Sequence, residues 1–333
     1  MSASHAVDPH LHLSGRRRWR PIEVAFWLAT LLPFVFTPAY LTLASQIAIT
    51  AIFAVSLDLI LGYAGLVSLG HAAFFGLGAY TAGLLAKAGW GEPLSGLLLA
   101  AAVAGLFGWL SGFVVTRVRH LALIMITLGI GLLLYEIANR ESWLTGGNDG
   151  LTGVAIWKLF GRFEFDLYGT TAYAYALAML LLVVLAARRL VHSPFGLSLR
   201  AIRENERRMP AIGAPSSARL RAIYTIAATI AGLAGGLLAQ TTQFVSLGAL
   251  SFERSAELVT ILVIGGTGRL YGGVIGAIVY LVARDRLSGI NPQYWYFWIG
   301  MMLIGVVLFL PNGILGGLAK ATEKLVPSAT TSA

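Results

Sequence analysis

Two polar side chains within an apolar stretch have types and a spacing that suit hydrolysis. Ser68 and His71 lie three positions apart, so both side chains would share one face of a helix. A nucleophile of the Gly-x-Ser-x-Gly type also needs a glycine two positions before the serine and an acid that orients the histidine. The sequence LVSLG around Ser68 lacks that glycine, and no acid is nearby. We therefore expect no catalysis here, and a hydrogen bond between helices is at least as good an interpretation of His71.

Motifs for binding nucleotides and metals are missing from the sequence. It contains no Gly-x-x-x-x-Gly-Lys-Ser/Thr phosphate loop, no Gly-Lys pair and no His-Glu-x-x-His. It has no cysteine, which excludes disulfides, iron–sulfur clusters and zinc thiolate sites. The segment 146–150, GGNDG, reads as a turn and does not have the spacing of a calcium loop. We expect neither an enzyme nor a bound cofactor or metal, so any energy must come from another chain.

Two acids also lie inside apolar stretches. Asp58 and Glu257 would each be costly in a bilayer without a partner, so each is a candidate for a functional role. The alternative is that both lie near an interface and are hydrated.

The amino-acid composition indicates the environment in which these polar residues lie. The chain has 333 residues, of which 57% are hydrophobic and 12% charged, and its mean hydropathy is +0.77. One globular core cannot bury so much apolar surface, which indicates a bilayer as the second solvent. A soluble enzyme, a disordered chain and a disulfide scaffold are excluded.

The apolar stretches predict an all-α polytopic membrane protein with about ten transmembrane helices, some of them broken or re-entrant. We expect a cytoplasmic basic tail over 1–20, a membrane domain over 21–312 and a cytoplasmic C-terminal tail over 313–333. The stretches lie at 22–36, 41–61, 65–86, 94–115, 121–138, 171–187, 219–240, 250–267, 270–283 and 294–310.

Arginine placement predicts the orientation. The net charge is +9, but the arginines gather before the first apolar stretch and in the loop 188–218, which follows the positive-inside rule and argues against nucleic-acid binding. The N-terminus and the loop 188–218 are therefore expected in the cytoplasm and the connection 139–170 outside. Arg284 and Arg286 do not fit the positive-inside rule, because counting the predicted helices from a cytoplasmic N-terminus places these two arginines outside.

The second notable feature of the composition is its glycine content, 39 residues. Clusters from Gly62 to Gly83 and from Gly265 to Gly276 each follow an apolar stretch that contains an acid. One interpretation is an internal repeat of two halves, of the kind that transporters build around a central path. Ordinary helix packing through small residues is an equally good interpretation.

The loop 188–218 predicts a short amphipathic helix. Ser193-Pro194 suits an N-cap followed by proline at the first helical position. Phe195, Leu199 and Ile202 then recur on one face. Such a helix could dock into a groove of a partner or lie on lipid headgroups, and the residues alone do not choose.

Six motifs, in order along the chain, resemble the permease subunits of branched-chain amino acid ABC importers of the LivM type. The resemblance runs from about residue 40 to 318. The motifs are LDLILGYAGLVSLGHAAFFGLGAY at 57–80, LTGGNDGLTG at 144–153, SPFGLSLRAIRENE at 193–206, AGLAGG at 231–236, IGGTGRLYGG at 264–273 and LPNGI at 310–314.

The resemblance implies that the central loop contacts an ATPase subunit, which favours docking over lipid anchoring. Met209-Pro210 depart from the family pattern, and proline there ends the helix early. The residues expected to couple are Phe195, Leu199, Arg200, Ala201, Ile202, Arg203, Glu204, Asn205 and Glu206.

A translocation path is expected along the glycine-rich segments. Helix N-termini near Gly65 and Gly268 would meet a substrate carboxylate, and Phe74 or Leu77 its aliphatic part. The candidate path residues are Gly65, Ser68, His71, Phe74, Gly266 and Gly268.

The implied function is import of leucine, isoleucine, valine or a similar small zwitterion across a bacterial cytoplasmic membrane by alternating access. The implied partners are a second homologous permease subunit, two ATP-binding subunits that hold the ATP, an extracytoplasmic solute-binding protein and membrane lipid. Permeases of this kind also serve urea, amides and other small organic solutes. An ion-coupled secondary transporter is the alternative from another class, and it would not need a docking helix.

Overall fold

The computed structural model describes residues 21–36, 38–166, 169–205, 209, 213 and 215–317. Regular structure there is helical, with two isolated bridges, Leu151 to Val245 and Leu159 to Phe163, so the all-α prediction is confirmed. The expected N-terminal tail 1–20, residues 318–333 of the expected C-terminal tail 313–333, and Glu206 lie outside these residues. The elements are α2 (Pro21–Ala29), α3 (Leu32–Phe36), η1 (Pro38–Tyr40), α4 (Leu41–Asp58), η2 (Leu59–Tyr63), α5 (Ala72–Lys87), α6 (Pro93–Val115), α7 (Leu121–Arg140), α8 (Ser142–Thr145), η3 (Gly147–Asp149), α9 (Thr170–Val191), α10 (Pro194–Glu204), α11 (Ser216–Thr242), η5 (Leu247–Leu250), α12 (Phe252–Gly265), α13 (Gly272–Ile290) and α14 (Trp295–Phe309).

Six helical segments of the described chain are long and apolar enough to cross a membrane. The prediction of about ten transmembrane helices is therefore not confirmed by length and composition. The difference arises where the helices are short: the expected stretch 65–86 is irregular before α5 begins at Ala72, and the expected stretch 250–267 has only the 14 residues of α12 in a regular helix. The six segments are Pro38–Tyr63, Pro93–Val115, Leu121–Arg140, Thr170–Val191, Ser216–Thr242 and Trp295–Gly317.

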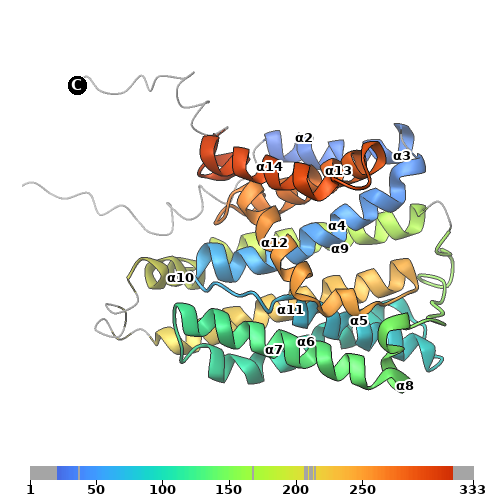
Figure 1. The fold of residues 1–333 in the computed structure, drawn as a ribbon, viewed down its shortest axis with the longest axis horizontal. Coiled ribbons are helices and arrows are strands. Elements are labelled where there is room, and N and C mark those ends of the chain that lie inside the picture. The colour runs from blue at the N-terminus through green and yellow to red at the C-terminus, as the bar shows by residue number, and fades with distance from the viewer. Residues whose placement is uncertain are drawn as a thin grey trace, which may run out of the picture.

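The helix ends gather at two opposite ends of the molecule, with α10 at the left and α8 at the right in Figure 1. At the α8 end, the Gln240 side chain donates to the carbonyl of Pro93 over 2.7 Å, and Arg286 lies 5.5 Å from the ring of Tyr40. At the α10 end, Arg188 pairs with Glu23 at 2.5 Å. Arg286 thus lies at the end where α4 begins.

The order of helices in the first half, α4 to α7, returns in the second half, α11 to α14. Each half has a long helix, an irregular segment, a shorter helix and two further helices. The directions are opposite, because α4 runs away from the α8 end whereas α11 runs toward it (Figure 1). This order pairs α4 with α11, whereas the glycine clusters had paired the segment after Asp58 with the segment after Glu257.

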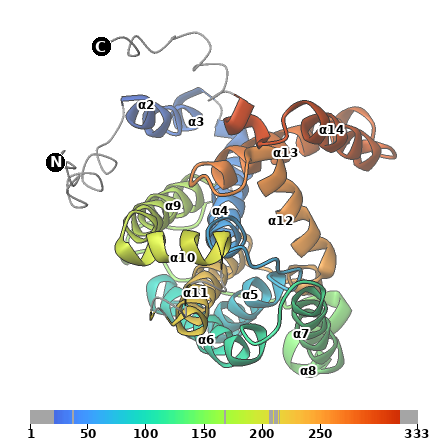
Figure 2. The same cartoon turned by 90° about the vertical axis from the view of Figure 1, so that its left-hand side faces the viewer.

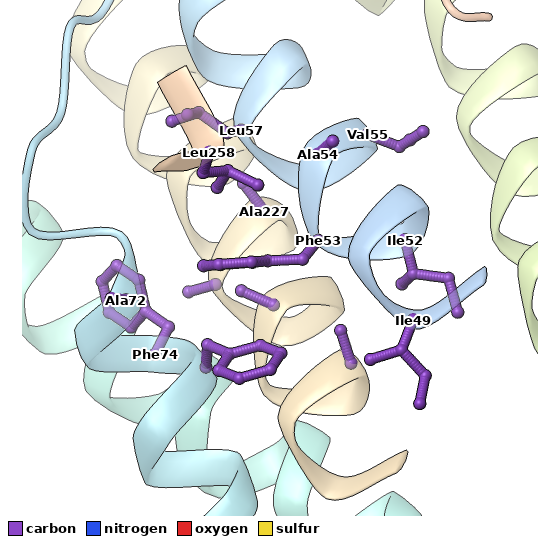
Figure 3. Close-up of a cluster of buried hydrophobic side chains, with 14 of the residues drawn as sticks. Ile49, Ile52, Phe53, Ala54, Val55, Leu57, Ala72, Phe74, Ala227 and Leu258 are labelled. Carbon is purple, nitrogen blue, oxygen red and sulfur yellow. The ribbon is translucent and has the colours of Figure 1, made fainter. Parts of the chain in front are cut away.

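Small residues let the central helices approach closely. α11 packs against α4, α5 and α6, and in Figure 2 it lies between α4 above and α6 below, beside α5. A side chain at Gly78 would meet the backbone of Gly232, and one at Gly235 would meet the carbonyl of Phe75. Aromatic side chains fill the remaining space: Phe53 and Phe75 stack with ring centroids 4.5 Å apart, next to Ile49 and Leu57 in the cluster of Figure 3.

Candidate coupling site

The predicted amphipathic helix is present as α10. Ser193 caps it, and its side-chain oxygen accepts a hydrogen bond from the N–H of Gly196 over 3.3 Å, with Pro194 at the first helical position. Local sequence therefore sets the start of α10, because a capping oxygen and proline both suit the first turn. The helix ends at Glu204, before Met209. The flanking helices end at Val191 and begin at Ser216, inside the limits expected for the loop.

The apolar stripe of α10 faces its own chain. Leu199 is 1% exposed and Ile202 2% exposed, and Phe195 is partly buried against the same core. The expectation that this stripe enters a groove of a partner is therefore wrong: the stripe attaches α10 to the bundle. The opposite side of the helix is exposed at Leu197, which is 45% exposed, and at Glu204.

Two arginines of α10 contact the end of the α4–η2 segment. Arg203 donates a hydrogen bond to the carbonyl oxygen of Gly62, and the guanidinium of Arg200 lies 5.2 Å from the ring centre of Tyr63. Arg203 is an exposed residue whose side chain links two segments that are 141 positions apart in the sequence.

A buried carboxylate joins the same place to the second half of the chain. Asp58, 1% exposed, accepts a hydrogen bond from the N–H of Gly268 over 2.7 Å. The π-helical turn η2 follows directly and brings Gly62 against Gly268, where a Cβ atom on Gly62 would meet both Asp58 and the Gly268 backbone. We call Asp58, Gly62, Arg203 and Gly268 the junction, because α4, α10 and the turn before α13 meet there.

The structure separates the expected path residues into three groups. Gly65 and Gly268 lie together beside Arg203, which is 3.0 Å from the Cβ position of Gly65 and 3.2 Å from that of Gly268. Gly266 packs on the carbonyl of Asn312 instead.

The third group lies in the protein core. Ser68, His71 and Phe74 are 2%, 0% and 1% exposed, and the His71 ring nitrogen Nε2 lies 2.8 Å from the hydroxyl of Ser56. His71 therefore joins the start of α5 to α4, in agreement with its interpretation as a hydrogen bond between helices. Phe74, expected to meet substrate, packs edge-on against Tyr224 at 5.5 Å.

The expected helix-terminus site for a substrate carboxylate is also wrong. The Gly268 N–H is already donated to Asp58, and neither Gly65 nor Gly268 begins a helix: α5 starts at Ala72 and α13 at Gly272. Both glycines have a positive φ of 75°, which only glycine adopts without strain. Conformation and close packing therefore explain them.

Sequence reasoning missed Gly62 and Tyr63 as parts of the junction. A signal for Gly62 was available, since it opens the motif Gly62-Tyr-Ala-Gly65 within a cluster of glycines. It also missed a cavity of about 510 Å³ beside α10, whose wall includes Gly65, Arg119, His120 and Ile202. In the described ranges, no group of three or more His, Cys, Asp or Glu could hold a metal ion.

Charges at the other end of the molecule help to position α6. Glu92 caps this helix by accepting hydrogen bonds from the N–H groups of Leu94, over 3.2 Å, and Ser95, over 2.5 Å. The hydrogen bond with the Ser95 side chain, followed by those from the backbone, holds the pKa of the Glu92 carboxyl below its usual value. A carboxylate at a helix N-terminus is favourable, so α6 is anchored where it enters the bundle.

Comparison with known proteins gives consistent results. Residues 39–307 match the family described as branched-chain amino acid transport system / permease component. The chain is 30% identical, over 86% of its length and 72% of theirs, to the high-affinity branched-chain amino acid transport system permease proteins LivM of Salmonella typhimurium and Escherichia coli. It is 27% identical, over 64% of its length and 61% of the relative's, to the fructose import permease protein FrcC of Rhizobium meliloti.

No solved structure matches this chain. The family match covers well over half of the sequence, and it includes α4 to α13 and therefore the whole junction. The chain belongs to the family of branched-chain amino acid transport permease components.

Proposed function

We propose that this chain is a membrane-spanning subunit of an ATP-driven importer of branched-chain amino acids, located in a bacterial cytoplasmic membrane. Separate ATPase subunits supply the energy, a second homologous permease completes the path, and an extracytoplasmic binding protein delivers the solute. The likeness to the LivM proteins, over more of the chain than the likeness to the fructose permease, favours amino acids as substrate. The observation that carries the proposal is the contact of Arg203 in α10 with Gly62 and Gly268, which belong to parts of the membrane domain that are far apart in the sequence.

Movement would pass from the ATPase through α10 to the junction. Leu199 and Ile202 fix the helix to the bundle, so a push on its exposed face moves the helix as a body. Arg203 then displaces the end of α4 through Gly62, and Asp58 carries the shift to Gly268 in the opposite half. The halves α4 to α7 and α11 to α14 run in opposite directions, and rocking of one against the other about the junction would open a central path alternately to the two sides of the membrane.

Ten crossings follow from this proposal when irregular segments are counted with the short helices. The segment 64–71 together with α5 would make one crossing, and 243–251 together with α12 would make another. The pair α2 and α3 would make a third, and α13 alone a fourth, in addition to the six long segments. The α10 end then faces the cytoplasm and the α8 end the outside, so Arg286 lies outside.

Reporter fusions test this topology. We expect a fusion at Arg117 and one at Arg203 to report cytoplasm and one at Asn148 to report the opposite side, because loop arginines resist translocation. A cytoplasmic signal from Asn148 would overturn both the crossing count and the outer position of Arg286.

Reconstitution tests the function itself. Purified alone, the chain is expected to hydrolyse no ATP, because it has no phosphate-binding loop. Co-expressed with the ATPases and second permease of the proposed importer, it is expected to co-purify with them and to take up radiolabelled L-leucine into proteoliposomes that contain ATP and the binding protein. Uptake driven by an ion gradient without ATP would instead support a secondary transporter.

A further inference from the structure

A cavity of about 730 Å³ lies between α12, α13, α14 and η5, away from the junction. Four charged side chains line it, Glu253, Arg254 and Glu257 from α12 and Arg284 from α13. The apolar part of the wall is formed by Leu238, Ile299 and Leu303. The cavity thus combines two positive groups, two negative groups and an aliphatic surface.

Three of these charges, Arg254, Glu257 and Arg284, are connected by ion pairs. Glu257 receives one hydrogen bond on each oxygen, from Arg254 at 2.8 Å and from Arg284 at 3.1 Å. Aromatic rings flank both guanidiniums: Phe75 lies 5.4 Å from Arg254, and Trp295 lies 5.4 Å from Arg284. The Glu257 and Arg254 side chains keep 15% and 20% of their surface exposed, and that of Arg284 keeps 42%.

Contacts with α4 and α5 locate this set inside the membrane domain. Ser255, between the two paired residues of α12, accepts a hydrogen bond from the N–H of Ala72 over 3.0 Å. The neighbouring His71 ring is stacked on Phe53 at 5.6 Å, and Phe53 lies near the middle of the span Pro38–Tyr63. Charges at that depth are expensive, and such charges generally serve binding or transport.

We propose that this cavity binds the backbone of a zwitterionic amino acid during its passage, an inference that rests on the proposed function. Arg254 and Arg284 would face the carboxylate and Glu253 and Glu257 the ammonium group, while the apolar wall receives the side chain. A zwitterion can exchange with the internal ion pairs and leave no net charge in a place of low dielectric constant, where an unpaired ion is costly. The N-terminus of α12, which opens at the cavity, adds a favourable field for the carboxylate.

The first test measures L-leucine uptake by the complete transporter in proteoliposomes. Glu257→Gln and Arg254→Gln are each expected to lower uptake about tenfold or more, because each leaves one ligand charge without its partner. The ATPases should still co-purify, since the junction is untouched. Asp285→Asn is the matched control: this acid is exposed on α13, next to Arg284, and does not line the cavity.

A charge exchange separates ligand binding from helix packing. The double variant Arg254→Glu with Glu257→Arg can restore the ion pair but moves each charge to a new place. We expect it to assemble and to remain inactive. Full uptake by this double variant, or normal uptake by Glu257→Gln, would show that the ion pairs only pack helices and would overturn the inference. A wild-type complex that transports no amino acid would reject the proposed function instead.

A second measurement does not depend on transport. The chain has no cysteine, so Thr260→Cys places one thiol of this chain in the cavity wall. Excess L-leucine is expected to slow its reaction with a thiol reagent in the assembled complex. A thiol from Thr241→Cys, in a different cavity at the α8 end, should react at the same rate with and without leucine. Equal rates at Thr260→Cys under both conditions would contradict the inference.

Discussion

Leu197→Asp is expected to release the ATPase subunits while leaving the permease folded. Leu197 is 45% exposed on the side of α10 that turns away from the bundle, so an acid there costs the isolated chain little. In contact with a partner, the same acid becomes an uncompensated buried charge, which costs about 3–5 kcal/mol. That cost weakens binding by roughly a hundredfold or more. Co-purification of the ATPases with affinity-tagged permease measures the effect directly.

Ile202→Asp and Leu197→Met complete this experiment. Ile202 is 2% exposed within its own chain, so an acid there is expected to prevent folding and to remove the permease from the membrane fraction altogether. Leu197→Met keeps an apolar side chain of similar size and should retain the ATPases. Normal ATPase binding by Leu197→Asp would show that the exposed face of α10 is not the docking surface.

Gly62→Ala is expected to give the second large effect, a loss of both stability and transport. The added methyl group would overlap Asp58 and the backbone of Gly268, so the hydrogen bond between them must lengthen or break. Overpacking at a buried site costs about 1–3 kcal/mol, and an orphaned buried N–H adds a penalty of about 1–3 kcal/mol. Thermal unfolding of the purified complex and L-leucine uptake are the two measurements.

Gly129→Ala provides the control for this substitution. Gly129 lies within α7, and no atom outside its own helix lies within 4 Å of its Cβ position. Alanine there is expected to leave stability unchanged or slightly higher, because alanine favours a helix over glycine. If Gly62→Ala melted and transported like Gly129→Ala, the close contact at the junction would have no part in stability or coupling.

Local signals in the sequence were sufficient for the class of the protein and for several elements. Composition and the lengths of the apolar stretches identified an all-α membrane protein, because a bilayer demands long apolar helices whatever their arrangement. Ser193-Pro194 located the start of α10 to the residue, because a cap and its proline act within a single turn. The broken segment around 266–271 was also anticipated, since glycines at that density interrupt a helix.

The tertiary structure alone decided which of these residues meet. Asp58 and Gly268 are 210 positions apart, Arg203 and Gly62 are 141 apart, and no periodicity connects such pairs. The sequence showed that α10 has an apolar face, but not what covers it. The hydrophobic effect has no direction, so a stripe such as Leu199 and Ile202 gains the same free energy against its own bundle as against a partner. Only the packing of α10 on the bundle shows that the chain covers this stripe itself and leaves the opposite face, with Leu197, open to another subunit.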